Sequence, residues 1–243
     1  TQSLKHADMN VTIGTQMLET VRGFPSVSKV RVCKIQNFAD DEAITRQTEH
    51  SLYLRERWGI QSTDFVVGYS GNLGRAHNLN TILDAATLLQ DCKDVKFLFV
   101  GGGAQHKRLS AEIAERQMSN IYLQPYQPRE HLCESLTLPN LHWASLKPGL
   151  EGFILPSKLY GIAAAGRPLL MIGAPDGEIG RLVSQFGFGK CIEEGAPEAV
   201  REYIMLVKND KCLVETMGKN ARKFIDGEAS REQAIQHWVK MLR

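Results

Sequence analysis

The chain has 243 residues, of which 43% are hydrophobic and 23% charged, as is typical of a globular protein with enough apolar material for a packed core. The formal net charge is +2 and no basic stripe with interleaved aromatic residues occurs, so the composition gives no reason to expect nucleic acid as a partner. The five cysteines and seven histidines are dispersed, which predicts a reducing compartment and no metal site. No apolar run approaches the roughly 20 residues that span a bilayer.

The first sixty residues differ from the rest. Strands are expected at 11–13 and 30–35 on either side of a helix at 15–22, followed by a turn at 37–41 and a polar helix at 42–58. Two strands alone make a marginal sheet, and the sequence does not begin with methionine. We therefore expect residues 1–36 to be the remnant of a separate N-terminal domain, and residues 37–62 to be a hinge and a helix.

From Phe65 onward, short β-branched or aromatic runs alternate with amphipathic helical patterns. The expected strands are 65–69, 95–100, 121–123, 141–145, 168–172 and 190–192. The expected helices are 79–89, 104–116, one opened by Pro128, 157–165, 178–186, 197–208, 211–225 and 231–242. This alternation predicts an α/β fold with a Rossmann-like parallel sheet and helices on both faces, which binds ligands at the carboxyl ends of its strands.

Two glycine-rich loops lie at such strand ends. Gly71-Asn72-Leu73-Gly74 follows the first strand of this region, and Gly101-Gly102-Gly103 follows the second. Glycines there let backbone N–H groups approach an anion, and a following helix N-terminus also favours negative charge. The first loop matches neither G-x-G-x-x-G nor the P-loop, and each loop is open to two interpretations: a ligand site at the backbone, or a tight turn between strand and helix.

A third segment runs from Glu151 to Pro168 and brings an acid and a lysine to either side of a short apolar loop. Ser157 is expected to cap the helix that follows, and Lys158 lies in its first turn. A lysine at that position opposes the helix dipole and so calls for an anionic partner, such as a diphosphate. The alternative is that Ser157 is only a cap and Lys158 only a solvated charge. Glu178, at the start of another helix, is expected to serve that helix's dipole.

Taken together, these segments resemble the C-terminal domain of family 4 glycosyltransferases, which have the GT-B fold of two facing Rossmann-like domains. Glu151-Gly152-Phe153 is similar to the family's E-G-F motif. Residues 156–160 and 164–168 are similar to the P-S-K-x-Y and A-A-G-x-P motifs of exopolysaccharide and lipopolysaccharide transferases, and residues 32–40 to the family's hinge. The resemblance implies a donor nucleotide-sugar-binding domain at 63–226 and a crossover helix at 227–243.

Three positions depart from the family pattern. The family's second glutamate corresponds to Gly161, Asn72 stands where an arginine is common, and His77 stands where a lysine is common. The reference pKa of histidine, about 6.5, leaves His77 mostly neutral at pH 7, although its protonated form could meet a phosphate. Lys158 can take over the missing positive charge.

The resemblance implies a retaining glycosyltransferase that uses a nucleoside-diphosphate sugar, UDP in preference to GDP, with no other cofactor and no metal. It implies catalytic roles for Glu151 and Lys158. The implied donor contacts are Gly71, Asn72, Leu73, Gly74, His77, Gly102, Gly103, Tyr126, Gln127, Gly152, Phe153 and Ser157. The acceptor, a cell-surface polysaccharide or a lipid-linked glycan, would bind through the missing N-terminal domain, and we expect the isolated fragment to be inactive.

Other expectations rest on the family alone or on the exposed face of an isolated domain. They are a cytoplasmic location, peripheral association with the inner membrane, and a homodimer. Two other functions stay open: a non-catalytic nucleotide-binding module of the same fold, which the missing second glutamate favours, and an NAD-dependent oxidoreductase. The latter needs an acid at the end of the second strand, where this chain has glycines.

Overall fold

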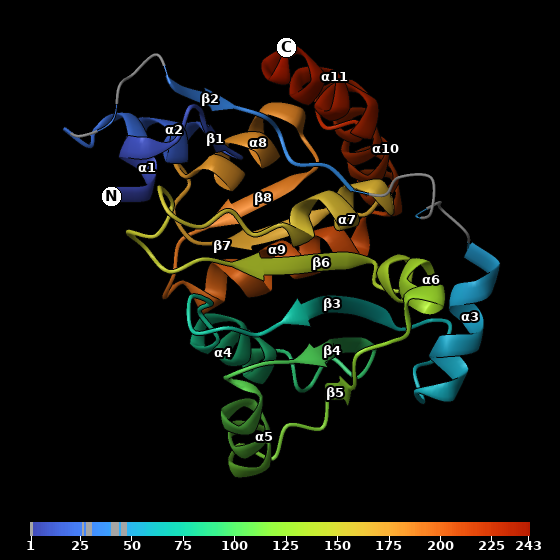
Figure 1. The fold of residues 1–243 in the computed structure, drawn as a ribbon. Helices are drawn as coiled ribbons and strands as arrows, with labels where there is room; N and C mark the ends of the chain where they lie inside the picture. Colours follow the sequence, from blue (N-terminus) through green and yellow to red (C-terminus); the bar gives the residue numbers. More distant parts are fainter. Residues whose placement is uncertain (1, 26, 28–30, 40–43, 45–47) are drawn as a thin grey trace.

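The computed structural model describes residues 2–25, 27, 31–39, 44 and 48–243, and its centre is one six-stranded sheet (Figure 1). All neighbouring strands are parallel, in the order β5-β4-β3-β6-β7-β8. The strands are β3 (Phe65–Asn72), β4 (Val95–Gly102), β5 (Ile121–Gln124), β6 (Leu141–Ser145), β7 (Leu169–Ile172) and β8 (Gly189–Ile192). The predicted Rossmann-like sheet is confirmed, and its direction of growth reverses between β3 and β6.

Helices cover both faces of this sheet. The helices of this part of the chain are α3 (Thr48–Arg57), α4 (Asn80–Leu88), α5 (His106–Glu115), η2 (Arg129–His131), α6 (Leu132–Thr137), α7 (Lys158–Ala164), α8 (Glu178–Phe186), α9 (Pro197–Asn209), α10 (Lys211–Glu228) and α11 (Arg231–Leu242). Of these, α11 lies outside the sheet beside α10 (Figure 1). The expected bounds of α8 and α11 are confirmed, and Pro128 precedes η2 as its N-cap. The helix expected at 42–58 is found as α3, and the earlier part of that range lies mostly outside the described residues.

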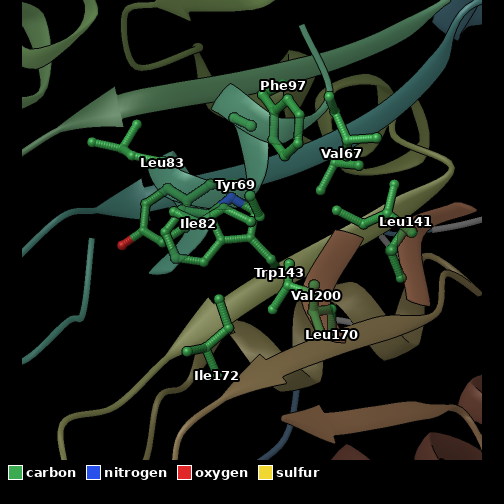
Figure 2. Packing of buried hydrophobic residues seen from close by; sticks show 14 of the residues in the cluster. Val67, Tyr69, Ile82, Leu83, Phe97, Leu141, Trp143, Leu170, Ile172 and Val200 are labelled. Carbon is green, nitrogen blue, oxygen red and sulfur yellow. The ribbon is translucent and has the colours of Figure 1, made fainter. Parts of the chain in front are cut away.

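Successive side chains of a strand point to opposite faces of the sheet, so each strand contributes to a core on both faces. Val67 and its same-face neighbours pack under α4 and α9, whereas Val66 packs with α3 on the other face. Figure 2 shows the first cluster, in which the rings of Tyr69 and Trp143 lie 4.7 Å apart between centroids. These side chains are almost fully buried, so the strands that end at the candidate site are rigidly held.

The N-terminal part forms a second, two-stranded parallel sheet beside α8 (Figure 1). It contains α1 (Gln2–His6), β1 (Asn10–Thr12), α2 (Thr15–Arg22) and β2 (Val32–Lys34). The expected helix at 15–22 is confirmed. The expected strands at 11–13 and 30–35 are found at slightly different bounds, with residues 28–30 outside the description, as are residues 40 and 41 of the expected turn. The end of α11 reaches this part, with Cys33 Sγ 3.9 Å from Met241 Sδ.

Glu178 joins the two parts of the chain. Its Oε2 accepts hydrogen bonds from the backbone N–H groups of Thr15 (2.8 Å) and Gln16 (3.0 Å), at the start of α2. In return, the Gln16 Oε1 accepts from the N–H of Glu178 (2.9 Å), at the start of α8. Glu178 was expected to serve its own helix, and instead its carboxylate caps a helix more than 160 positions away in sequence. Sequence could not show this, because the two partners lie far apart along the chain and no local pattern pairs them.

The structure shows no helix, within the residues it describes, that is both long and apolar enough to cross a membrane.

Candidate functional site

A hollow of about 450 Å³ opens at the carboxyl end of β3, where the order of the strands reverses. In open α/β sheets this is the point at which ligands bind, because the loops on either side diverge there. Its lining comes from the end of β3 and the loop after it, from the segment before α7, from α7 itself, from apolar side chains of α6, and from Ile44. The lining residues are Ile44, Ser70, Gly71, Asn72, His77, Leu132, Leu136, Ile154, Leu155, Pro156, Ser157, Lys158 and Gly161.

Lys158 is the cation of this hollow, and two side chains hold its amine. Nζ donates to the hydroxyl of Tyr69 (2.6 Å) and lies 3.4 Å from Nε2 of His77. It also lies 3.9 Å from the centre of the Tyr69 ring, within the range of a cation–π contact. Within the described part of the chain, no carboxylate lies within ion-pair distance of Lys158. The amine is therefore positioned by neutral groups and is available to an anion.

Burial disfavours charge on this amine. Desolvation lowers the pKa of Lys158 from 10.5 to about 7. Burial, together with the nearby charge of Lys158, also lowers the pKa of His77, against the opposing effect of its hydrogen bond to Ser145. His77 therefore stays neutral at pH 7, and the hollow contains one amine near half-protonation.

The strands extend further than expected, so Gly71 and Asn72 are the last residues of β3, and this end of the glycine segment is bonded to the end of β4. Gly71 has φ +125°, which favours glycine, and a Cβ there would lie 3.8 Å from Cε of Lys158. The N–H of Leu73 donates to the carbonyl of Gly102 (2.7 Å), and that of Gly74 donates to the carbonyl of Asn72 (3.1 Å). The N–H groups of Leu73 and Gly74 were expected to face a phosphate. In the structure they already donate to backbone carbonyls, so these two groups are not available to an anion.

The second glycine loop meets an exposed aromatic side chain. The ring of Tyr126, which is 58% exposed, lies 3.2 Å from where a Cβ on Gly102 would be. A Cβ on Gly103 would come within 2.3 Å of Oδ1 of Asn72, so only glycine fits there. Gln127 bonds within its own loop, to the carbonyl of Pro125 (2.9 Å). The structure therefore brings Gly102, Gly103 and Tyr126 beside Asn72, at the rim of the Lys158 hollow.

Glu151 is absent from the lining of the Lys158 hollow and belongs to a different cavity. It lines a small cavity of about 10 Å³ together with Gly177 and Glu178, and only the segment 154–156 is shared with the Lys158 hollow. Its Oε1 is buried and has no hydrogen-bond partner in the described residues. A buried carboxylate oxygen without a partner is costly, so this oxygen is a candidate acceptor for a hydrogen-bond donor on a bound molecule.

The rest of the E-G-F segment faces outward or toward the N-terminal part. A Cβ on Gly152 would lie 2.3 Å from the hydroxyl of Thr20, whereas Phe153 is 62% exposed. Ser157 occupies the N-cap position of α7 but makes no capping hydrogen bond, contrary to the expectation. Its backbone there is helical, and a capping side chain needs an extended backbone.

Two residues that organise the site were missed by sequence reasoning. Tyr69 was assigned only to a buried strand, yet its hydroxyl donates to the carbonyl of Asn72 (2.8 Å) and accepts from Lys158. Gln105 donates to the carbonyls of Gly74 (2.7 Å) and His77 (3.0 Å), which fixes the loop after β3. A tyrosine at the end of a predicted strand beside a glycine loop was the available signal for the first, and nothing in the sequence marked the second.

Comparison with known proteins identifies the family of this chain. The family described as glycosyl transferases group 1 matches residues 53–224, most of the chain. The chain belongs to this family of glycosyltransferases. WcaI of Escherichia coli (strain K12), named as a colanic acid biosynthesis glycosyl transferase, is 26% identical to it over 230 residues, which cover 93% of this chain and 52% of WcaI. WbjE of Pseudomonas aeruginosa, named as a glycosyltransferase, is 27% identical over 139 residues, covering 57% of this chain and 34% of WbjE.

The glycosyltransferase chain thus spans about half the length of WcaI. Among solved structures, HepE of Anabaena in complex with UDP-glucose has a TM-score of 0.84 at 16% identity, covering 99% of this chain and 65% of HepE. WaaG, a glycosyltransferase involved in lipopolysaccharide biosynthesis, has a TM-score of 0.77 at 13% identity, covering 93% of this chain and 60% of WaaG. At these identities the likeness concerns the fold, which is that of GT-B glycosyltransferases.

Proposed function

We propose that this chain is the donor-binding part of a retaining glycosyltransferase that uses a UDP-sugar and passes the sugar to a polysaccharide or lipid-linked acceptor. The observation that carries the proposal is the amine of Lys158, which lies beside Gly71 at the switch point of the sheet with no carboxylate in ion-pair range in the described residues. A buried cation with an open side and no acid nearby suits a diphosphate. HepE, which has a similar fold, was solved with UDP-glucose, and this supports UDP as the nucleotide.

In this proposal, Lys158, Gly71 and Asn72 contact the diphosphate, and Tyr126 lies near the base. The bond between the anomeric carbon of the sugar and the diphosphate oxygen breaks, and its electron pair leaves with the diphosphate. Lys158 stabilises that developing negative charge without a metal ion. The acceptor hydroxyl oxygen then bonds to the anomeric carbon on the face that the diphosphate left, and its proton passes to the departing phosphate.

Glu151 is proposed to orient the donor sugar. Its unpartnered Oε1 needs a hydrogen-bond donor, and a sugar hydroxyl is one. Because the segment 154–156 lies between Glu151 and the Lys158 hollow, sugar binding would require that segment to shift. The acceptor would contact residues of an N-terminal domain, so this chain is expected to bind donor without turning it over.

The test is calorimetric titration with UDP, GDP, TDP and NAD of the wild-type chain and of Lys158→Ala. We expect UDP to bind, and the variant to bind it at least about tenfold more weakly, since a charge-assisted hydrogen bond contributes about 1.5–3 kcal/mol. Lys107→Ala, which removes an exposed lysine on α5, is the matched control and should leave affinity unchanged. Binding of NAD alone would contradict the proposal and favour an oxidoreductase, and binding of no nucleotide would contradict both the donor-binding role and the alternative of a nucleotide-binding module.

A further inference from the structure

The two groups that hold Lys158 are themselves fixed by backbone carbonyls. The hydroxyl of Tyr69 donates its one proton to the carbonyl of Asn72 (2.8 Å). Nδ1 of His77 lies 2.6 Å from the carbonyl of Ser145 and must carry the proton of a neutral ring, which leaves Nε2 as an acceptor. Both groups can therefore only accept hydrogen bonds from the amine of Lys158.

This geometry distinguishes the two protonation states of the amine. A neutral amine has two N–H groups, which Tyr69 and His77 can both accept, and its lone pair then faces the hollow. A protonated amine has three N–H groups, and the third is left for an anion in the hollow. The anion-binding state is therefore the protonated one, and it differs from the resting state by one proton.

We propose that Tyr69 and His77 are positioning residues that hold the Lys158 amine above Gly71, and that this amine takes up a proton when a nucleoside diphosphate binds. This inference rests on the proposed function and adds the linkage between donor binding and pH.

The surroundings of Lys158 support this linkage. The loop after β3 brings His77, and β3 brings Tyr69, whose own pKa is raised by burial and by nearby Tyr126. In the described part of the hollow, α6 and the segment before α7 add no charged side chain. Burial alone lowers the pKa of Lys158 to about 7, so the free site is half neutral at pH 7 and mostly neutral at pH 8. A bound diphosphate restores the charge, as an opposite charge raises the pKa of an amine.

The first experiment measures UDP binding to the wild-type chain between pH 7.5 and 8.5. The phosphate of UDP, with a second pKa of about 6, stays ionised across this range and contributes little to the pH dependence. From the pKa of about 7, affinity should fall about eightfold, and calorimetry in two buffers of different ionisation enthalpy at pH 8 should count about 0.9 proton taken up per UDP bound. Lys158→Arg, whose charge is permanent, is the matched control and should change less than about twofold.

The second experiment tests the positioning role with Tyr69→Phe. Removing the hydroxyl takes one acceptor from the charged amine, so its pKa should fall further and the loss of UDP affinity should begin at lower pH than in the wild type. A purely structural role would instead lower affinity by the same factor at every pH, which would overturn the positioning role. UDP binding without proton uptake would overturn the proposed linkage while leaving the proposed function standing. No UDP binding at any pH would overturn both.

Discussion

Replacing Lys158 by methionine should stabilise this chain while it weakens nucleotide binding. Methionine keeps an unbranched side chain of similar length and contains no charge to desolvate. The lysine amine is largely buried, and its pKa is lowered from 10.5 to about 7 by that burial. Folding therefore costs free energy whenever the amine is protonated in the unfolded chain, and the variant is free of that cost.

The size of the effect follows from the pKa. At 1.36 kcal/mol per pKa unit, the amine costs the folded state about 4 kcal/mol at pH 7 relative to an exposed lysine. The methionine variant loses the hydrogen bonds of the amine to Tyr69 and His77, which reduces its gain in stability by about 1–2 kcal/mol. Between the folded pKa and the unfolded value the unfolded chain binds more protons, so the stability of the wild type rises with pH, by about 2 kcal/mol from pH 7 to pH 9. The variant lacks this contribution.

Urea denaturation at pH 7, 8 and 9 measures both effects. We expect Lys158→Met to raise the free energy of unfolding by about 2–3 kcal/mol at pH 7, and the difference from the wild type to shrink as pH rises. The control is Lys107→Met on the exposed face of α5, which should change stability by no more than about 0.5 kcal/mol at any pH. If the free energies of unfolding of Lys158→Met and the wild type differ by the same amount at pH 7, 8 and 9, the amine is not desolvated in the folded chain and the prediction is wrong.

Two further predictions concern the fold. Glu178→Ala should destabilise the chain by about 2–4 kcal/mol, because its buried carboxylate accepts two backbone N–H groups of α2. Hydrogen exchange in the first turn of α2 should accelerate more in this variant than in Glu178→Gln, and a Glu178→Gln rate equal to that of the wild type would show that the cap is not charge-assisted. Gly189→Ala should cost more than about 3 kcal/mol in urea denaturation, since a Cβ there would lie 1.8 Å from the carbonyl oxygen of Leu169, in the neighbouring strand. Gly227→Ala, on α10 with no atom within 4 Å, should instead stabilise by up to about 1 kcal/mol, and a similar loss in both variants would contradict the steric argument.

The fold was predictable because its signals are local. The strand around Val67 begins with a run of apolar residues, and the helices of the sheet region have apolar residues at helical spacing. Parallel pairing follows from the alternation of the two, since a helix between strands returns the chain to the same edge. The family match to residues 53–224 agrees with what these patterns and the E-G-F segment had indicated.

Part of the candidate site was predictable for the same reason. Glycine loops at strand ends and a lysine at a helix start lie at known places in such a sheet, so Gly71, Asn72 and Lys158 were expected near one another, and they do line one hollow. The sequence could not place Glu151 relative to Lys158. That depends on how the segment 154–156 packs, and in the structure the two side chains line different cavities that share only this segment.

The sequence by itself determined the class of fold, the order of its elements and the residue types at the strand ends, because each of these depends on neighbours along the chain. Only the tertiary structure decided the state of Lys158. Its amine is buried, which lowers its pKa, and it contacts the hydroxyl of Tyr69 and the unprotonated Nε2 of His77. These two side chains are about 80 to 90 positions away in sequence. Desolvation and hydrogen bonding act through space, and no local pattern records which distant groups will surround an amine.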